Sequence, residues 1–396
     1  MGRGPVVMAW GQNNVSERRV EFVVEAKKGI ESFTKLCQDF EISRPTGYLW
    51  LKRYQANKSL RDLQELSRRP HGSPGETARA IQDRVVALRQ KWPDWGAPKI
   101  RVLLQREGLT LPVVTIHRIL LRHGLVRPRD RHRPAVRRFT REAPNDLWQM
   151  DFKGMPKSRN GCLPLALLDD HSRYLPGLFA LPGTFGAGVR NSLIQAFEEC
   201  GLPDAMLMDH GTPWWDMNSP LGWTQLTIWL MEQGIRLHLS GYRHPQTQGK
   251  VERCNGSMEE AMLRRPKPER MPWQEWLDAF REEYNRVRPH EALGMDTPAQ
   301  HWCRSRRVFD PNRKTWEYPV PAQVRTVGAN AGVSIDGKRC YVSRSLIGKQ
   351  VYLKDLDESV VVYYCRTPIR QFDRRDGSSF FLTYTGGREF VQTPSA

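Results

Sequence analysis

Two short apolar runs in the middle of the chain carry aspartates where a carboxylate is costly to bury. The run from Leu147 to Phe152 reads as a strand that contains Asp151, and the run from Pro203 reads as a short strand that ends on Asp209. Burying a carboxylate costs several kcal/mol unless it is paired or bound to a metal. Open α/β sheets place their sites where strands end in loops. The two runs therefore predict a sheet with a functional edge.

A third carboxylate, Glu252, lies near the start of a predicted helix that follows a loop containing proline and glycine. Helical spacing places Glu252 on one face with Gln248 and Asn255. Three clustered carboxylates repel one another unless divalent cations neutralise them, and Mg²⁺ prefers oxygen ligands while it keeps bound waters. The predicted catalytic and metal-binding residues are therefore Asp151, Asp209 and Glu252.

Such a trio suits two Mg²⁺ ions about 4 Å apart across a phosphodiester. One ion would activate an attacking water or 3′-hydroxyl, and the other would stabilise the leaving oxygen. No covalent protein nucleophile is then required.

The pattern around these residues predicts an α/β core and a β-rich end. Strands are expected over 147–152, 163–168, 174–181, 203–209 and 235–239, and helices over 189–200, 226–233 and 249 to about 284. Three strands followed by strand–helix alternation indicate a mixed sheet with helices on its faces. After about residue 307, short β-branched and aromatic runs between Gly/Asp turns indicate a small antiparallel β barrel.

The front of the chain has helical periodicity in two blocks. From Ser16 to about Asn57 three short helices are expected, and Ser43 or Thr46 can cap the third. A tight turn before that helix resembles a helix-turn-helix, whose last helix enters a DNA major groove. A second block of three helices follows residue 75, which predicts a second module of the same kind. A plain three-helix bundle without a DNA role is the alternative for the first block.

The stretch from Arg127 to Arg138 holds six arginines and two prolines in twelve residues. It cannot bury an apolar face, so an extended linker is expected, lying along a DNA backbone or serving only as a solvated hinge. The predicted domains are two helix-turn-helix domains (1–70 and 71–126), an Arg-rich linker (127–143), a catalytic core (144–306) and a small β-barrel domain (307–396).

Net charge points to a polyanionic partner. The chain carries +18, and residues 1–145 hold 29 Lys and Arg against 14 Asp and Glu, which is +15 of that total. Attraction to phosphate is therefore concentrated at the front.

The cysteines and the hydropathy pattern indicate the cellular compartment. The seven cysteines are scattered, with no C-x-x-C pair that would suggest zinc or a redox motif. No signal peptide and no run of about 18 apolar residues is present. We expect a soluble, intracellular protein with no membrane partner.

Five ordered segments resemble the catalytic core shared by retroviral integrases and bacterial insertion-sequence transposases, the rve or DDE core. The segments lie within residues 144–303 and are Trp148-x-x-Asp151, Leu168–Tyr174, Asp209–Thr212, His244–Asn255 and Tyr284–Gly294. The resemblance implies a ribonuclease-H-like fold, Mg²⁺ or Mn²⁺ as the metal, and DNA cleavage at element ends followed by strand transfer. The two predicted helix-turn-helix modules and the predicted β barrel extend the resemblance, less specifically, to most of the chain.

Two features depart from that family. The gap from Asp209 to Glu252 is 43 positions, longer than is usual, and the excess is Pro213 to Trp223. We place this insertion in a loop, where it affects target choice but not the metal site. The zinc-binding His/His/Cys/Cys module of retroviral integrases has no counterpart, so recognition of DNA ends falls to the helix-turn-helix modules.

Further residues are predicted to contact DNA from the predicted recognition helices, the linker and the helix of Glu252. They are Thr46, Tyr48, Lys52, Arg53, Arg118, Arg127, Arg129, Arg131, Arg133, Gln248, Lys250, Arg253 and Asn255.

For several residues near the predicted site, the sequence allows two roles. Asp169 and Asp170 are either ligands or, as favoured, partners in a turn or ion pair. His171 and His210 are expected to be structural, and the Trp273/Trp276/Phe280 stripe is expected to be core. Arg288 and His290 either contact DNA or cap the last helix.

The sequence thus predicts a bacterial DNA transposase that binds terminal inverted repeats and target DNA as a homo-oligomer, in the cytoplasm and at the nucleoid when DNA-bound. A non-catalytic DNA-binding regulator derived from such an enzyme is the alternative. A ribonuclease H shares the core chemistry but has no need of the basic front.

Overall fold

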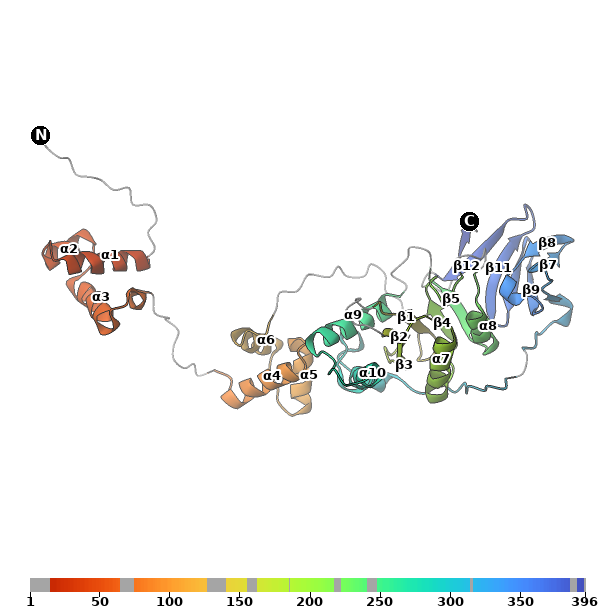
Figure 1. Ribbon diagram of the computed structural model, residues 1–396, viewed down its shortest axis with the longest axis horizontal. Helices are drawn as coiled ribbons and strands as arrows, with labels where there is room; N and C mark the ends of the chain where they lie inside the picture. Colours follow the sequence, from red (N-terminus) through yellow and green to blue (C-terminus); the bar gives the residue numbers. More distant parts are fainter. Residues whose placement is uncertain are drawn as a thin grey trace, which may run out of the picture. The chain divides into compact units, whose positions relative to one another are not determined.

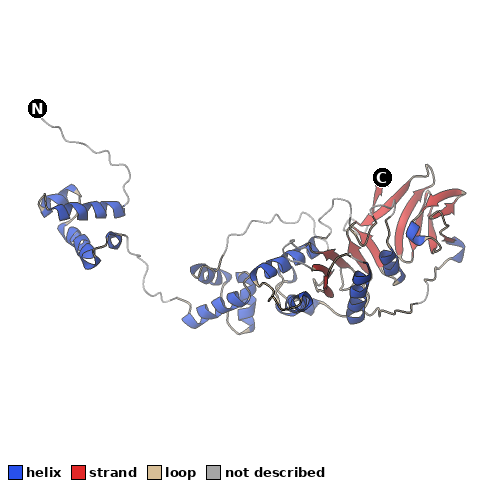
Figure 2. Cartoon of the chain, viewed as in Figure 1, coloured by secondary structure: helices blue, strands red, loops and turns tan. Residues whose placement is uncertain are grey.

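The computed structural model describes residues 15–64, 75–126, 140–154, 162–184, 186–216, 222–240, 248–313, 316–384 and 390–394. Contacts divide the chain into two compact units, Met1–Thr77 and Ala78–Ala396. Figure 1 labels the helices and strands, and Figure 2 shows that the first unit is helical and that strands dominate the C-terminal end.

The first unit is built from three helices and a short 3₁₀ turn, as the periodicity predicted. They are α1 (Val15–Lys28), α2 (Phe33–Asp39), α3 (Arg44–Asn57) and η1 (Leu60–Leu63). Ser43 is the N-cap of α3, because its side chain accepts a hydrogen bond from the backbone N–H of Thr46. Phe22 fills the centre of the unit, and Gly47 lets α3 approach it, since a Cβ there would lie 2.7 Å from the Phe22 ring.

The second unit begins with another three-helix group. Its helices are α4 (Arg79–Lys91), α5 (Ala97–Arg106) and α6 (Val113–Arg122). Ile100, Leu104, Ile116 and Ile119 are fully buried and form its centre. Their i, i+3 and i+4 spacing is the amphipathic pattern that predicted these helices.

A mixed five-stranded sheet forms the middle of the second unit. Its strands are β1 (Trp148–Phe152), β2 (Leu163–Asp169), β3 (Gly177–Leu181), β4 (Ala205–Met208) and β5 (Arg236–Leu239). Their order is β3-β2-β1-β4-β5, in which β1 is antiparallel to β2 and parallel to β4. The predicted third strand began at Tyr174, but β3 begins at Gly177 because the preceding residues form a turn closed by the bond from Asp169 N to Tyr174 O, 2.8 Å.

Helices cover both faces of this sheet. The longer ones are α7 (Gly186–Cys200), α8 (Gln225–Glu232), α9 (Gly249–Arg264) and α10 (Trp273–Glu282). Shorter turns follow at η3 (Glu283–Val287, π-helical), η4 (Glu291–Leu293) and η5 (Pro298–His301). Because side chains alternate along a strand, Leu165 and Leu167 pack with α7 and α8, whereas Ala166 and Leu168 pack with α9 and α10.

The C-terminal region is antiparallel β, as predicted, but the predicted barrel is not confirmed. Its elements are η6 (Pro321–Gln323), β6 (Val324–Thr326), β7 (Gly332–Ile335), β8 (Lys338–Tyr341), η7 (Arg344–Leu346), β9 (Gln350–Leu356), β10 (Ser359–Tyr364), β11 (Thr367–Asp373), β12 (Ser379–Tyr384) and β13 (Phe390–Pro394). Within the described residues, six strands form one sheet in the order β13-β12-β11-β10-β9-β6, and β7 and β8 form a separate hairpin. The pairing therefore leaves an open sheet.

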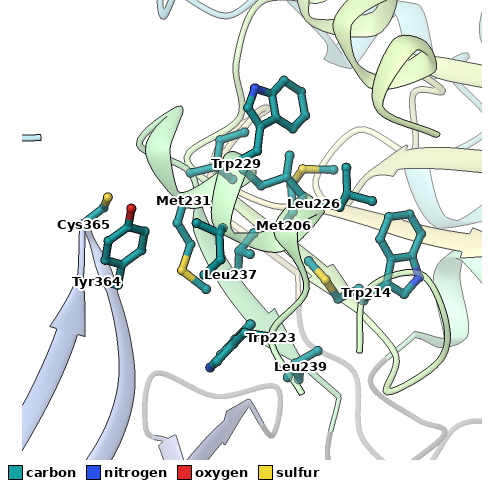
Figure 3. Packing of buried hydrophobic residues seen from close by; sticks show 14 of the residues in the cluster. Met206, Trp214, Trp223, Leu226, Trp229, Met231, Leu237, Leu239, Tyr364 and Cys365 are labelled. Atoms are coloured by element: carbon teal, nitrogen blue, oxygen red, sulfur yellow. The ribbon is translucent and has the colours of Figure 1, made fainter. Parts of the chain in front are cut away.

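This C-terminal sheet shares one hydrophobic core with the α8 side of the central sheet. Figure 3 shows Tyr364 and Cys365 beside Met231 and Leu237. Several hydrogen bonds cross the same boundary. Among them, Tyr364 Oη donates to Glu232 Oε1 at 2.8 Å, and Leu237 N donates to Thr367 Oγ1 at 3.0 Å. The edge strand β5 is thus covered by the C-terminal strands.

The α4–α6 group is joined to the central region by buried charges. Asp94, between α4 and α5, forms ion pairs with Arg288 at 2.8 Å and with Arg265 at 3.3 Å. Arg265 also pairs with Glu283, and Arg106 Nη1 donates to Val287 O at 3.0 Å. The second helical group is therefore packed on α9 and η3. Among the described residues, no helix is long and apolar enough to cross a membrane.

Candidate active site

Asp151 and Asp209 lie at the same edge of the central sheet. In the parallel pair β1–β4, Gln149 is opposite Leu207, so the register carried two residues further places Asp151 beside Asp209. Neighbouring strands in a sheet are about 4.8 Å apart. Asp151 is half-buried in β1, and Asp209 is the first residue after the fully buried strand β4.

Asp209 is oriented by the turn that follows it. Its Oδ1 accepts a hydrogen bond from the backbone N–H of Gly211 at 3.0 Å. A Cβ on Gly211 would lie 3.0 Å from both carboxylate oxygens of Asp209, which is closer than ordinary contact. Glycine at this position therefore leaves room for the carboxylate.

Glu252 lies in the first turn of α9, which packs on β1 and β2. Its side chain is exposed, whereas that of Asn255, one turn later, is buried. Asn255 Nδ2 donates to Asp151 Oδ2 at 2.9 Å. The predicted face of α9 thus reaches Asp151 through Asn255.

The pKa of Asp151 reflects both its burial and its acidic neighbours. Burial, and to a smaller extent the negative charges of Asp209 and Glu252, raise this pKa from 3.8 to about 6, while the hydrogen bond from Asn255 opposes the rise. Burial also raises the pKa of Glu252. A cation at this edge would relieve the repulsion that favours the protonated Asp151.

The three side chains do not form a compact ligand set. Within the described residues, no three carboxylate, histidine or cysteine side chains come close enough together to hold a metal. Two observations still fit a hard cation: the donors at the edge are carboxylate oxygens, and Asn255 Oδ1 is buried without a hydrogen-bond partner. The chemistry of the donors fits Mg²⁺, and the ligand set remains a prediction.

Asp169 and Asp170 have the structural roles that the sequence favoured. Asp169 Oδ1 accepts hydrogen bonds from the backbone N–H and the hydroxyl of Ser172, at 2.8 and 2.6 Å. Asp170 forms a 2.7 Å ion pair with Lys250. Both carboxylates are fully buried, which is explained by these partners.

The described residues of the insertion between Asp209 and Glu252 pack against the site. In its described part, Trp214 is buried and stacks on Phe152 with ring centroids 5.6 Å apart. Trp215 meets the ring of His210 edge-on at 5.4 Å and pairs with Trp223 through an isolated β-bridge. The insertion therefore contacts the neighbours of both aspartates.

The other residues for which the sequence allowed two roles have structural contacts. The predicted core stripe is confirmed, since Trp276 and Phe280 are buried and Trp273 packs beside them. Arg288 takes neither of the roles weighed for it, because it pairs with buried Asp94. Burial lowers the pKa of His290 to about 3, and its ring lies edge-on to Tyr284.

The two histidines beside the aspartates differ in their contacts. His171 Nδ1 lies 2.8 Å from Arg141 O, which fits the predicted structural role. Burial lowers the pKa of His210, and the charge of Asp209 opposes that shift.

The predicted DNA-contacting residues of the two helix-turn-helix modules lie on α3 and α6. Thr46, Tyr48, Lys52 and Arg53 lie on α3, where Tyr48 and Lys52 are exposed. Arg118 is exposed on α6. Their contacts with DNA stay predictions.

The others lie on α9 or outside the described residues. Arg253, directly after the first turn of α9, is exposed, whereas Gln248 and Asn255 are buried. The linker arginines lie outside the described residues, and they are Arg127, Arg129, Arg131 and Arg133.

Sequence reasoning missed Gln149 as a member of this site. It is fully buried, two residues before Asp151 and on the same side of β1. Its Nε2 donates to Asp170 Oδ1 at 2.8 Å, and its Oε1 accepts from Val251 N at 3.3 Å. The available signal was an amide at an inward position of an apolar strand, which requires buried partners.

Comparisons with known proteins identify two domains in the chain. Residues 233–298, which contain α9, match the model of the integrase core domain, and residues 46–120 match that of a homeodomain-like domain. The uncharacterized 31.7 kDa protein of insertion element IS407 from Burkholderia multivorans is 26% identical over 257 residues, covering 60% of this chain and 86% of that protein. The chain is thus similar to insertion-element proteins and contains a match to the integrase core domain. The uncharacterized 39.2 kDa protein of insertion element IS476 from Xanthomonas euvesicatoria is 28% identical over 245 residues, covering 57% of this chain and 66% of that protein.

Solved structures give distant similarities. The magnesium-bound catalytic core domain of HTLV-2 integrase aligns with 40% of this chain and 97% of its own, at 16% identity and a TM-score of 0.32. A chain of the simian T-cell lymphotropic virus intasome aligns with 79% of this chain and 99% of its own, at 14% identity and a TM-score of 0.37.

Proposed function

We propose that the chain is a DNA transposase that cleaves DNA at transposon ends and joins those ends to target DNA, with Asp151, Asp209 and Glu252 as its catalytic carboxylates. The observation that carries the proposal is that Asp151 and Asp209 lie side by side at one edge of the sheet and that Asn255, one turn after Glu252 on α9, donates a hydrogen bond to Asp151. Carboxylates that repel one another at a partly buried sheet edge are a liability for a protein that only binds DNA, and they suit a divalent metal. The integrase core match supports the same chemistry.

Each residue then has a defined task. Asp151 and Asp209 would hold metal from adjacent strands, and Glu252 would do so from the first turn of α9. Mg²⁺, with Mn²⁺ as a substitute, supplies Lewis-acid stabilisation of the phosphodiester and activation of water or a 3′-hydroxyl. Asn255 holds the Asp151 carboxylate through its 2.9 Å hydrogen bond.

The test is a cleavage and joining assay on labelled DNA that carries the terminal repeats, in Mg²⁺, comparing the wild type with Glu252→Gln. We expect loss of about a thousandfold in rate, because the amide cannot neutralise a cation, while DNA binding is kept. Glu282→Gln, which alters an exposed ion pair on α10, is the matched control and should cleave normally. Cleavage by Glu252→Gln at the wild-type rate would refute the assignment. A wild type that binds the ends but never cuts them would favour a regulator.

The first compact unit is proposed to bind the element ends through α3. We expect residues 1–77 alone to bind duplex DNA with an affinity that falls steeply with salt, because lysines and arginines displace counterions from phosphate. Lys52→Ala should lower the slope of log K against log salt by about one. Electrophoretic mobility shifts at several salt concentrations measure this. Affinity that did not change with salt would contradict the proposal.

Two further properties are proposed with the function. The active form is a homo-oligomer, since two ends must be processed together, and it acts in the cytoplasm at the bacterial nucleoid. The bacterial insertion-element relatives support this setting. The predicted domain boundaries at 70, 126, 143 and 306 are kept as part of the proposal.

A further inference from the structure

A fourth carboxylate, Asp170, lies close to the proposed site yet is not available to a metal. It is fully buried at the end of β2, and all its oxygens have protein partners. Oδ1 accepts from Gln149 Nε2 at 2.8 Å, and Oδ2 accepts from Arg141 N at 2.8 Å and pairs with Lys250 Nζ at 2.7 Å. Lys250 Nζ also donates to the backbone oxygen of Asp170 at 2.9 Å. Lysine therefore supplies here the positive charge that a metal would supply to the other carboxylates.

The same partners fix the start of α9. Its N-cap residue, Gln248, makes no side-chain capping bond. In place of that cap, Gln149 Oε1 accepts from Val251 N at 3.3 Å, while Lys250 is tied to Asp170. Helices begin with backbone N–H groups that lack partners within the helix, so an acceptor from β1 stabilises this first turn. Glu252 is the next residue along.

One turn later, α9 is attached to β1 again. Asn255 Nδ2 donates to Asp151 Oδ2, and Asp151 lies on the same side of β1 as Gln149. The hydrogen bonds to Gln149 and Asp151 therefore hold α9 to β1 at two points. Together they fix the rotation of the helix about its axis and its distance from the strand. The segment that carries Glu252 lies between them.

We propose that Asp170, Lys250 and Gln149 are positioning residues that hold the first turn of α9, and with it Glu252, at the edge of the sheet. The role of Glu252 rests on the proposed function, but the attachment of α9 does not. In this arrangement Lys250 is the counter-ion of Asp170, in contrast to the phosphate contact that the sequence suggested. Lys250 is only 17% exposed, and its ammonium is already paired.

The experiment is a double-mutant comparison of Lys250→Met, Asp170→Asn and the two combined. Each single change leaves one buried charge without its partner, which is strongly destabilising, whereas the pair of changes removes both charges together. The first readout needs neither metal nor DNA: hydrogen exchange of the peptide that covers residues 249–255. We expect exchange to rise about tenfold or more in each single variant and to return most of the way in the double variant.

Two further measurements separate positioning from DNA binding. In EDTA, Lys250→Met should bind duplex DNA within about twofold of the wild type, because the ammonium does not contact phosphate. In Mg²⁺, its maximal cleavage rate should fall about tenfold or more at saturating DNA and recover in the double variant. Gln149→Met removes the acceptor for Val251 N without creating an unpaired charge, so it should raise exchange in the same peptide even if a single charge variant fails to fold.

The possible results are distinct. Lost DNA affinity in Lys250→Met that Asp170→Asn does not restore would overturn the proposal in favour of a phosphate contact. Unchanged exchange of residues 249–255 in Gln149→Met and in both single variants would overturn it as well. If Glu252→Gln cleaves normally but the exchange results hold, the catalytic assignment fails while the attachment of α9 stands.

Discussion

Asp151→Asn is expected to abolish DNA cleavage, by about a thousandfold or more, while making the metal-free protein more stable. The loss follows because a neutral amide provides weaker ligation than the carboxylate that the proposed mechanism places on the metal. The gain follows because the folded protein holds Asp151 among like charges and partly out of water, which raises its pKa to about 6. The substitution removes this unfavourable charge, and the oxygen of the introduced amide can still accept the bond from Asn255.

The sign of the stability effect depends on pH. Folded Asp151 binds its proton more tightly than the unfolded chain, whose aspartates have an ordinary pKa near 3.8, so metal-free stability falls as pH rises from about 4 to about 6 and stays lower above that range. At pH 7.5 in EDTA, Asp151→Asn should therefore unfold with a free energy larger by on the order of 1–3 kcal/mol. At pH 4 the two proteins should differ little. Urea unfolding at both pH values measures this, and a less stable variant at pH 7.5 would contradict the crowding of charge at the site.

Removal of residues 317–396 is expected to make the remaining chain insoluble or to abolish its cooperative unfolding. The C-terminal strands share a core with the central region, in which Met231, Leu237 and Ile228 are at most 3% exposed. Each such side chain contributes about 1.5–3 kcal/mol when buried. Exposing several at once therefore costs an amount comparable with the usual net stability of a domain, about 5–15 kcal/mol.

The matched control removes a similar length from the other end. Deletion of residues 1–77 takes away a compact unit with its own core around Phe22, so the rest of the chain should stay soluble and melt cooperatively. Calorimetry and size-exclusion chromatography of the two deletions provide the comparison. A soluble, cooperatively melting 1–316 would show that the shared core is not required.

Features that depend on residues close together in the sequence could be predicted, whereas contacts between distant residues could not. Strands β1 and β4 and their aspartates were predictable because alternation and apolar runs are local signals, and Ser43 was predictable as a cap because its partner is three residues away. The Asp94–Arg288 pair joins residues 194 positions apart, and no periodicity indicates such a contact. Lys250 was assigned to phosphate because a basic residue near Glu252 carries no local sign of its buried partner, Asp170, which follows β2. The open C-terminal sheet was missed because short strands alone do not determine whether a sheet closes.

The burial of Asp94 between Arg265 and Arg288 limits how this protein can be re-engineered. A chimera that takes residues 75–126 from a relative would bring a new surface against two arginines and would leave at least one buried charge uncompensated unless the donor also supplies an acid at that point. Grafting of new DNA specificity should therefore exchange residues 1–64, whose core is its own, or should transplant the α4–α6 group together with α9 and η3 as a single cassette.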